Sequence, residues 1–191
     1  MSTNSVVAYL NEDGSVVSSY VHYDGYETGV GMMLLEHYNT DKCARDLAST
    51  LGYASSLSET VAESHADRVH TDEPETFESM EEFELYLMEN SHLEFGYLWT
   101  GGKWMVATWS HETIGHGYDA RYESTWNGFA WLVPAFVRSG RKTVDRYRER
   151  ALEDNREGRN EWDEYADELE VTVDKWHRYG MGEIASEAMA A

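Results

Sequence analysis

Cysteine is almost absent from this sequence, because Cys43 is the single one among 191 residues. One cysteine excludes an internal disulfide and any metal site built from several cysteines. Cys43 lies in a segment with a helical pattern. A catalytic thiol is expected beside a glycine-rich turn or a partner histidine, and the sequence around Cys43 has neither. We therefore expect a structural helix residue at this position rather than a nucleophile.

Long apolar runs are also missing. No stretch reaches the ~18 apolar residues that a membrane-spanning helix needs. Residues 1–7 have neither the basic start nor the apolar stretch of a secretory signal. We therefore expect a cytoplasmic protein that makes no contact with a membrane.

Positive charge is scarce, since 15 Lys and Arg stand against 36 Asp and Glu and give a formal net charge of −21. Residues 1–110 hold 19 of the acids and four of the bases, a formal charge of −15. Such a field repels nucleic acid and anionic lipid and attracts basic protein surfaces. We expect no direct binding of nucleic acid, and a basic protein surface as the partner.

Three explanations account for the acidity. The acids imitate the phosphates of DNA and occupy the groove of a DNA-binding protein, or they adapt the chain to a high-salt cytoplasm, or they maintain solubility. Four lysines in the whole chain suit salt adaptation, whereas 24 Glu against 12 Asp and the many large aromatic residues do not. The sequence alone leaves all three open.

Aromatic residues are plentiful: seven Trp, thirteen Tyr and five Phe provide enough apolar surface for a core. Residues 6–10 and 16–23 are rich in strand-forming side chains and flank an Asp-Gly dipeptide, which predicts a hairpin. Residues 95–99 and 103–109 flank a Gly-Gly dipeptide and predict a second one. We expect an α+β fold, with an antiparallel sheet built from two β-hairpins, helices on one face of it, and a C-terminal helical extension.

Helices are predicted between and after the hairpins. The pattern indicates helices over 32–38, over 40–51 with Thr40-Asp41 at its start, and over 78–90, while 53–79 is predicted to be a surface loop. We divide the chain into an α+β domain (1–110), an aromatic and glycine-rich connection (111–133) to which we assign no structure, and a helical region (134–191). The last region is predicted to hold helices over about 135–155 and about 160–179.

The densest acidic stretch precedes and enters the predicted helix 78–90. It is our candidate partner-binding site, either a phosphate-like ribbon or a solvated face. Its acids are Asp72, Glu73, Glu75, Glu78, Glu81, Glu82, Glu84 and Glu89.

Catalytic motifs are not recognisable. His111 and His116 in the segment HETIGH are five residues apart, whereas the zinc-protease motif requires four. His22, Asp24 and His37 are weak candidate metal ligands, because a strand end and the following helix meet near them, and a structural role in the glycine loop is the alternative. We expect no cofactor and no enzymatic activity.

Residues 138–150 hold six bases, for which we expect partners in the acidic helix that follows or in a neighbouring subunit. In that following helix, an apolar stripe of helical spacing runs from Trp162 to Trp176. The stripe is expected to serve core packing, with a homodimer through the 160–179 helix as the alternative.

Four blocks resemble a family of small uncharacterised accessory proteins of tailed bacteriophages and prophages. They are LNEDGSV (10–16), YVHYDGY (20–26), LLEHY (34–38) and YLWTGGKW (97–104), and the resemblance covers residues 6–109. It implies a phage-encoded protein made in the cytosol of a host bacterium, and it carries no catalytic residues. We therefore expect a non-enzymatic acidic protein that binds a basic host protein. The more specific hypothesis is a DNA mimic that inhibits a host DNA-binding or defence protein. The alternative is a metal- or small-molecule-binding module centred on His22, Asp24 and His37.

Overall fold

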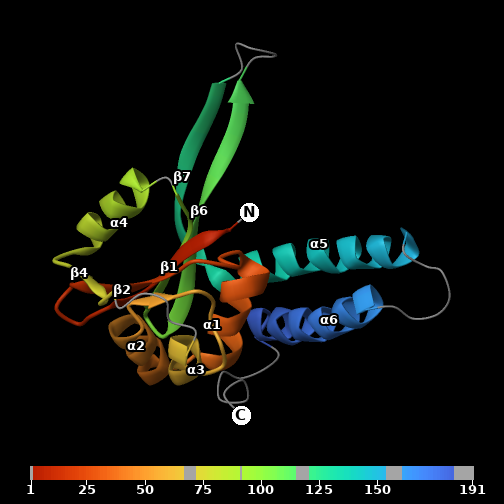
Figure 1. The fold of residues 1–191 in the computed structure, drawn as a ribbon, viewed down its shortest axis with the longest axis horizontal. Helices are drawn as coiled ribbons and strands as arrows, with labels where there is room; N and C mark the ends of the chain where they lie inside the picture. Colours follow the sequence, from red (N-terminus) through yellow and green to blue (C-terminus); the bar gives the residue numbers. More distant parts are fainter. Residues whose placement is uncertain (1, 67–71, 91, 115–120, 154–160, 183–191) are drawn as a thin grey trace.

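The computed structural model describes residues 2–66, 72–90, 92–114, 121–153 and 161–182, and Figure 1 shows their arrangement. A mixed sheet of seven strands carries helices on both sides, and two long helices extend from it. The strands are β1 (Asn4–Leu10), β2 (Val16–Val21), β3 (Tyr53–Ala54), β4 (Glu75–Phe77), β5 (Leu93–Thr100), β6 (Lys103–Ile114) and β7 (Arg121–Trp131). The helical elements are the π-helical turn η1 (Glu27–Gly31), α1 (Met32–His37), α2 (Asp41–Thr50), α3 (Val61–Ala66), α4 (Met80–Glu89), α5 (Leu132–Glu153) and α6 (Glu161–Gly180).

Both predicted hairpins are confirmed. β1 pairs antiparallel with β2, and β5 pairs antiparallel with β6. The turns use Gly14 at φ 89° and Gly101 and Gly102 at φ 57° and 77°. A residue with a Cβ rarely adopts this left-handed conformation, which is why the glycine-containing dipeptides were informative.

The hairpins join through a parallel pair, which corrects the prediction of an antiparallel sheet. Val7 of β1 lies opposite Tyr97 of β5, and the strand order is β3-β2-β1-β5-β6-β7, with β4 pairing to the free part of β2. A parallel pair needs a long connection between its strands, and α1 to α4 lie within the one that links the two hairpins. Turn signals specify only the strands they connect, so they did not reveal how the hairpins meet.

Helices cover both faces of the sheet, so the prediction of helices on one face is also wrong. In β1, Val7 and Tyr9 belong to a cluster with α1, α2 and α5, whereas Val6 and Ala8 pack toward α4. Successive strand residues point to opposite faces, and β1 is buried along its whole central part. A strand buried on both faces reads as a continuous apolar run, as in a parallel sheet between two layers of helices.

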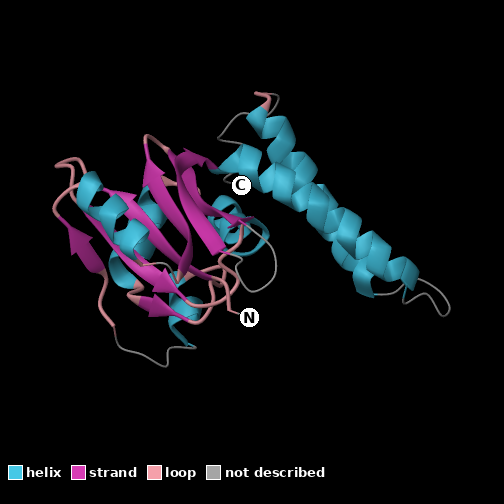
Figure 2. Ribbon diagram, turned by 90° about the horizontal axis from the view of Figure 1, so that it is seen from above, coloured by secondary structure: helices cyan, strands magenta, loops and turns pink. Residues whose placement is uncertain are grey.

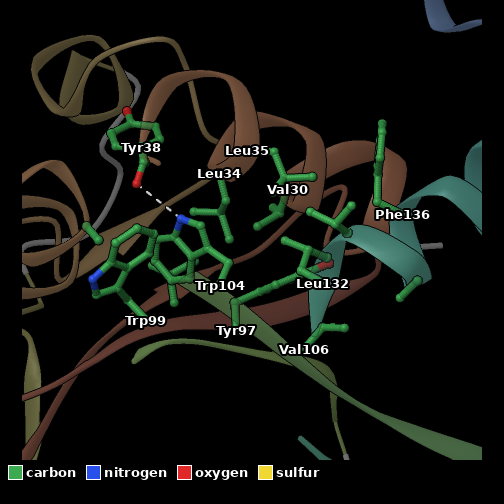
Figure 3. Packing of buried hydrophobic residues seen from close by; sticks show 14 of the residues in the cluster. Val30, Leu34, Leu35, Tyr38, Tyr97, Trp99, Trp104, Val106, Leu132 and Phe136 are labelled. Carbon is green, nitrogen blue, oxygen red and sulfur yellow. Dashed lines mark hydrogen bonds between the residues drawn. The ribbon is translucent and has the colours of Figure 1, made fainter. Parts of the chain in front are cut away.

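The larger core lies between the sheet and the α1, α2 and α5 layer (Figure 3). Trp99 and Trp104 meet edge to face with ring centroids 5.4 Å apart. The indole nitrogen of Trp104 donates a hydrogen bond of 3.1 Å to the Tyr38 carbonyl oxygen, drawn as the dashed line in Figure 3. Leu132 and Phe136 of α5 enter the same cluster, so the base of the long helices is part of this core.

The predicted start of α2 at Thr40-Asp41 is confirmed, whereas α4 and α5 begin at Met80 and Leu132 rather than at 78 and about 135. The predicted loop over 53–79 is only partly a loop. The Thr40 hydroxyl accepts a hydrogen bond from the Cys43 amide at the start of α2, and Gly52 ends that region at φ 66°. β3, α3 and β4 lie within 53–79. β3 and β4 have two and three residues and depend on pairing with β2, so no local periodicity could indicate them.

The region after residue 110 contains a long strand pair and a helical hairpin. β6 continues to Ile114 and pairs with β7, so the stretch 111–133 contains strand where we had assigned no structure, and both strands extend beyond the rest of the sheet (Figure 1). α5 and α6 confirm the two predicted helices and pack against each other as a hairpin (Figure 2). A Cβ on Gly140 would lie 2.3 Å from Val173, which shows how closely these helices approach. The division into three regions stays a prediction.

Candidate functional site

The eight predicted acids lie together on β4, on α4 and on the segment leading into them, and we call this set the acidic face. All are exposed except Glu84, which is half-buried. α4 turns Phe83 and Leu87 toward the sheet, where both are fully buried. The opposite side of α4 is therefore outward and carries most of the helix's charge. The acidic face consists of Asp72, Glu73, Glu75, Glu78, Glu81, Glu82, Glu84 and Glu89.

One member of the acidic face has a structural task. The Glu82 carboxylate accepts a hydrogen bond of 2.6 Å from the Glu78 amide, while the Ser79 hydroxyl accepts one of 3.2 Å from the Glu82 amide. This reciprocal arrangement satisfies the free amides at the start of α4, where a negative charge also complements the helix dipole. Glu82 is thus explained by the fold.

Other members have no such explanation. Glu81 and Glu89 are exposed on the outer side of α4, and the half-buried Glu84 lies at the border of that side. Among the residues that the structure describes, none of the seven glutamates of the acidic face forms an ion pair. Between these glutamates, Leu85 and Met88 expose 46% and 39% of their surface. The outer side of α4 therefore combines uncompensated carboxylates with two exposed apolar side chains.

In the hairpin of α5 and α6, unlike on α4, some charged side chains form ion pairs with each other. Arg148 of α5 contacts both Asp167 and Glu170 of α6, as the prediction of partners in the acidic helix required. Lys175 pairs with Glu36 of α1 at 2.8 Å. Two acids of α6, Asp167 and Glu170, thus share a basic partner within the chain, whereas no glutamate of α4 has an ion-pair partner among the described residues.

A pocket of about 250 Å³ opens beside the acidic face, on the same side of the sheet as α4. Its lining includes three tyrosines and three members of the acidic face, and we call it the tyrosine–carboxylate pocket. These six residues are Tyr20, Tyr53, Tyr86, Asp72, Glu73 and Glu75. Ser18 of β2, 2% exposed, also lines the pocket.

Neighbouring side chains hold the tyrosine rings of the pocket in place, and the surroundings of Tyr20 and Tyr86 favour their neutral forms. The rings of Tyr20 and Tyr53 stack with centroids 5.5 Å apart and an angle of 30° between their planes. The Tyr20 hydroxyl lies 3.0 Å from His22 Nδ1. Burial, and then the neighbouring Tyr53, raises the pKa of Tyr20. Burial raises the pKa of Tyr86 strongly, and the Glu75 carboxylate beside it raises it further.

Sequence analysis missed these tyrosines. Tyr20 and Tyr53 come together because they are opposite each other in the pair of β2 with β3. In the sequence, the strand pattern around Tyr20 was the only indication of this contact. The partner strand β3 has two residues, which are too few to show a periodic pattern.

The structure does not bring the weak metal candidates together. Among the described residues, no group of three or more His, Cys, Asp and Glu side chains could hold a metal ion, and this includes His22, Asp24 and His37. The Asp24 carboxylate accepts a hydrogen bond from the Tyr26 hydroxyl, and its carbonyl oxygen accepts one from the Val30 amide. Asp24 also has φ 58°, so it shapes the glycine loop as the structural alternative proposed. His116 of the HETIGH segment lies outside the described residues.

The remaining candidates have structural surroundings. Cys43 is a free, half-buried residue of α2 that packs against the larger core. Leu169, Val173 and Trp176 of the apolar stripe are buried, which confirms core packing for this part of α6. Trp162 is half-buried and packs against Tyr147 of α5.

Within the described part of the chain, no helix combines the length and the apolar character required to cross a membrane. Comparison with known proteins assigns no family, since no protein-family model, no curated protein and no solved structure matches this chain.

Proposed function

We propose that this chain is a non-enzymatic protein that binds a basic surface of another protein through the acidic face. The observation that carries the proposal is the outer side of α4, where Glu81, Glu84 and Glu89 have no ion-pair partner among the described residues. Glutamates held close together repel one another and weaken the folded state, so their concentration here favours a role outside the fold. A basic partner surface would relieve that repulsion.

The exposed apolar residues of α4 favour a protein as the partner. Protein interfaces combine an apolar centre with a polar or charged rim. Leu85 and Met88, surrounded by Glu81, Glu84 and Glu89, have this arrangement.

The resemblance to phage accessory proteins supports a bacterial host protein as the partner. In the more specific version of the proposal, that host protein is one that normally binds DNA. α4 has 10 residues and four glutamates after its first position. At 1.5 Å per residue it is ~15 Å long, or one charge per ~4 Å, close to the ~3.4 Å spacing along one DNA strand. The four glutamates of α4, the capping Glu82 included, thus approach the charge density of a single strand. Duplex DNA would compete with this protein for the partner.

The test compares two triple variants of equal charge. In Glu81→Gln/Glu84→Gln/Glu89→Gln, the outer side of α4 loses its charge while the Glu82 contacts remain. In the control, Glu149→Gln/Glu164→Gln/Asp174→Asn, the same charge is removed from exposed positions of α5 and α6. A partner captured from bacterial lysate by the unchanged protein is purified, and its Kd for each form is measured.

We expect the α4 triple variant to bind at least about tenfold more weakly, because each neutralised interface charge contributes up to ~1 kcal/mol. The control should bind within about twofold of the unchanged protein, since its charges lie away from the interface. Equal weakening by both variants would reject the acidic face as the binding surface and leave net charge as the cause.

A further inference from the structure

The geometry points to the tyrosine–carboxylate pocket as the receptor for one guanidinium group, supplied by an arginine side chain of the partner. This inference rests on the proposed function, because the basic partner surface provides the arginine. It adds a specific anchoring contact to what would otherwise be a diffuse attraction between charged surfaces. Three features of the pocket carry it, and each comes from different residues.

The first feature is the aromatic wall. Tyr20 and Tyr53 stack on each other and both line the pocket, together with Tyr86. The face of an aromatic ring attracts a cation placed within ~6 Å of its centre, and arginine is the commonest protein cation in such contacts. A planar guanidinium group also stacks flat on a tyrosine ring, which an ammonium group cannot do.

The second feature is the charge at the pocket. Asp72, Glu73 and Glu75 line it, while no Lys, Arg or His is among its lining residues in the described chain. Carboxylates accept the parallel N–H groups of a guanidinium in a two-pronged contact that is stronger than a neutral hydrogen bond. The acids thus supply acceptors beside the ring faces that would hold the flat side of the same group.

The third feature is an unused hydroxyl in the pocket wall. Ser18 is 2% exposed and lies in β2 on the α4 side of the sheet, like Tyr20 two residues later. Its hydroxyl forms no hydrogen bond with any residue in the described part of the chain. Because this oxygen is not among the fully buried side-chain atoms that lack a partner in the described chain, it opens onto the pocket, where it can accept a hydrogen bond from an N–H donor of a ligand.

Size and composition argue against other ligands. About 250 Å³ is below the ~300–1,000 Å³ of pockets for drug-sized molecules. A single side chain is therefore a better fit than a cofactor. A metal ion is disfavoured because these carboxylates do not form one of the close groups that could coordinate it, among the residues described.

The test uses a small probe in place of the partner. Nα-acetyl-arginine-N-methylamide is titrated into the isotopically labelled full chain at low salt, and chemical shifts are followed by NMR. The citrulline analogue has nearly the same shape without the charge, and the lysine analogue has the charge without the planar group. We expect saturable shifts with the arginine probe, at least about fivefold weaker binding of the lysine analogue, and no saturation with the citrulline analogue.

Two pairs of variants locate the site. Glu73→Gln should weaken the arginine probe at least about fivefold, whereas Glu81→Gln, the same change on α4 outside the pocket, should weaken it less than about twofold. Ser18→Ala should weaken the probe about threefold and leave the Tm unchanged, because the hydroxyl has no partner to lose in the described fold. Equal effects of Glu73→Gln and Glu81→Gln, or a lower Tm with unchanged probe affinity in Ser18→Ala, would overturn the inference.

The two proposals fail in distinguishable ways. If only the pocket inference is wrong, the α4 triple variant still loses the captured partner, but the arginine probe does not bind or binds without dependence on Glu73. If only the proposed function is wrong, the probe binds with that dependence while partner capture is indifferent to the α4 charges.

Discussion

The hydroxyl of Tyr97, in the central strand β5, donates a hydrogen bond of 2.8 Å to the carbonyl oxygen of Gly25, 72 residues earlier in the chain. Tyr97 is fully buried, and the Gly25 amide in turn donates a hydrogen bond to the Thr3 carbonyl oxygen. This contact fixes the glycine loop between β2 and α1 against the middle of the sheet.

Tyr97→Phe should destabilise the protein by about 1–2 kcal/mol, because it leaves a buried carbonyl oxygen without its donor. Chemical denaturation followed by tryptophan fluorescence measures the change. Tyr23→Phe is the matched control, since Tyr23 is 48% exposed, and it should change the free energy of unfolding by less than about 0.5 kcal/mol. Equal stabilities of the two variants would show that the Tyr97 contact does not hold the loop.

The close approach of α5 and α6 gives a second prediction. Gly140→Ala places a Cβ 2.3 Å from Val173 Cγ2 in the backbone geometry of the present fold. Overpacking of this kind costs about 1–3 kcal/mol, which exceeds the ~1 kcal/mol that alanine gains over glycine in a helix.

Gly140→Ala should therefore lower the free energy of unfolding, and adding Val173→Ala should make the Gly140→Ala substitution less harmful. A double-mutant cycle measures this coupling. A stabilising Gly140→Ala substitution would contradict the packing described for the helical hairpin.

The alkaline behaviour of Tyr26 gives a third prediction. Tyr26 is 40% exposed, and the desolvation of its covered part, together with the Asp24 carboxylate that accepts its hydrogen bond, raises its pKa to about 12. Because the folded pKa lies above the unfolded value of ~10, this group contributes stability below pH ~10, and the contribution is lost as the pH rises toward about 12.

Absorbance at the phenolate wavelength should therefore show several late-titrating tyrosines in the folded protein, and the amplitude near pH 12 should be smaller by one tyrosine in Tyr26→Phe. The loss of stability between pH ~10 and ~12 should also be smaller in this variant. An unchanged titration curve would show that Tyr26 ionises as an ordinary exposed phenol.

Local signals in the sequence predicted local structure well. An Asp-Gly and a Gly-Gly dipeptide identified both hairpins because their glycines take left-handed conformations, and Thr40 identified the start of α2 because its hydroxyl caps that helix. The stripe on α6 predicted buried residues because helical spacing places them on one face.

Long-range pairing escaped sequence analysis for a physical reason. The parallel contact of β1 with β5 depends on which edges of two hairpins meet, and the side-chain pattern of β1 shows only that both faces are covered. The same limit hid the pocket, since Tyr20 and Tyr53 meet through a two-residue strand. The acids of the candidate site were recognisable by their density, but the capping role of Glu82 required the position of Ser79 at the helix start.

The central claim is that carboxylates on α4 meet positive charge on a protein partner. The most direct measurement is the Kd for the purified partner between about 50 mM and about 200 mM salt, because screening weakens such contacts over this range. We predict that the unchanged protein binds markedly more weakly at the higher concentration, and that the Glu81→Gln/Glu84→Gln/Glu89→Gln variant shows a shallower dependence on salt. A Kd that is the same at both concentrations, or an equal salt dependence in the variant, would contradict the account.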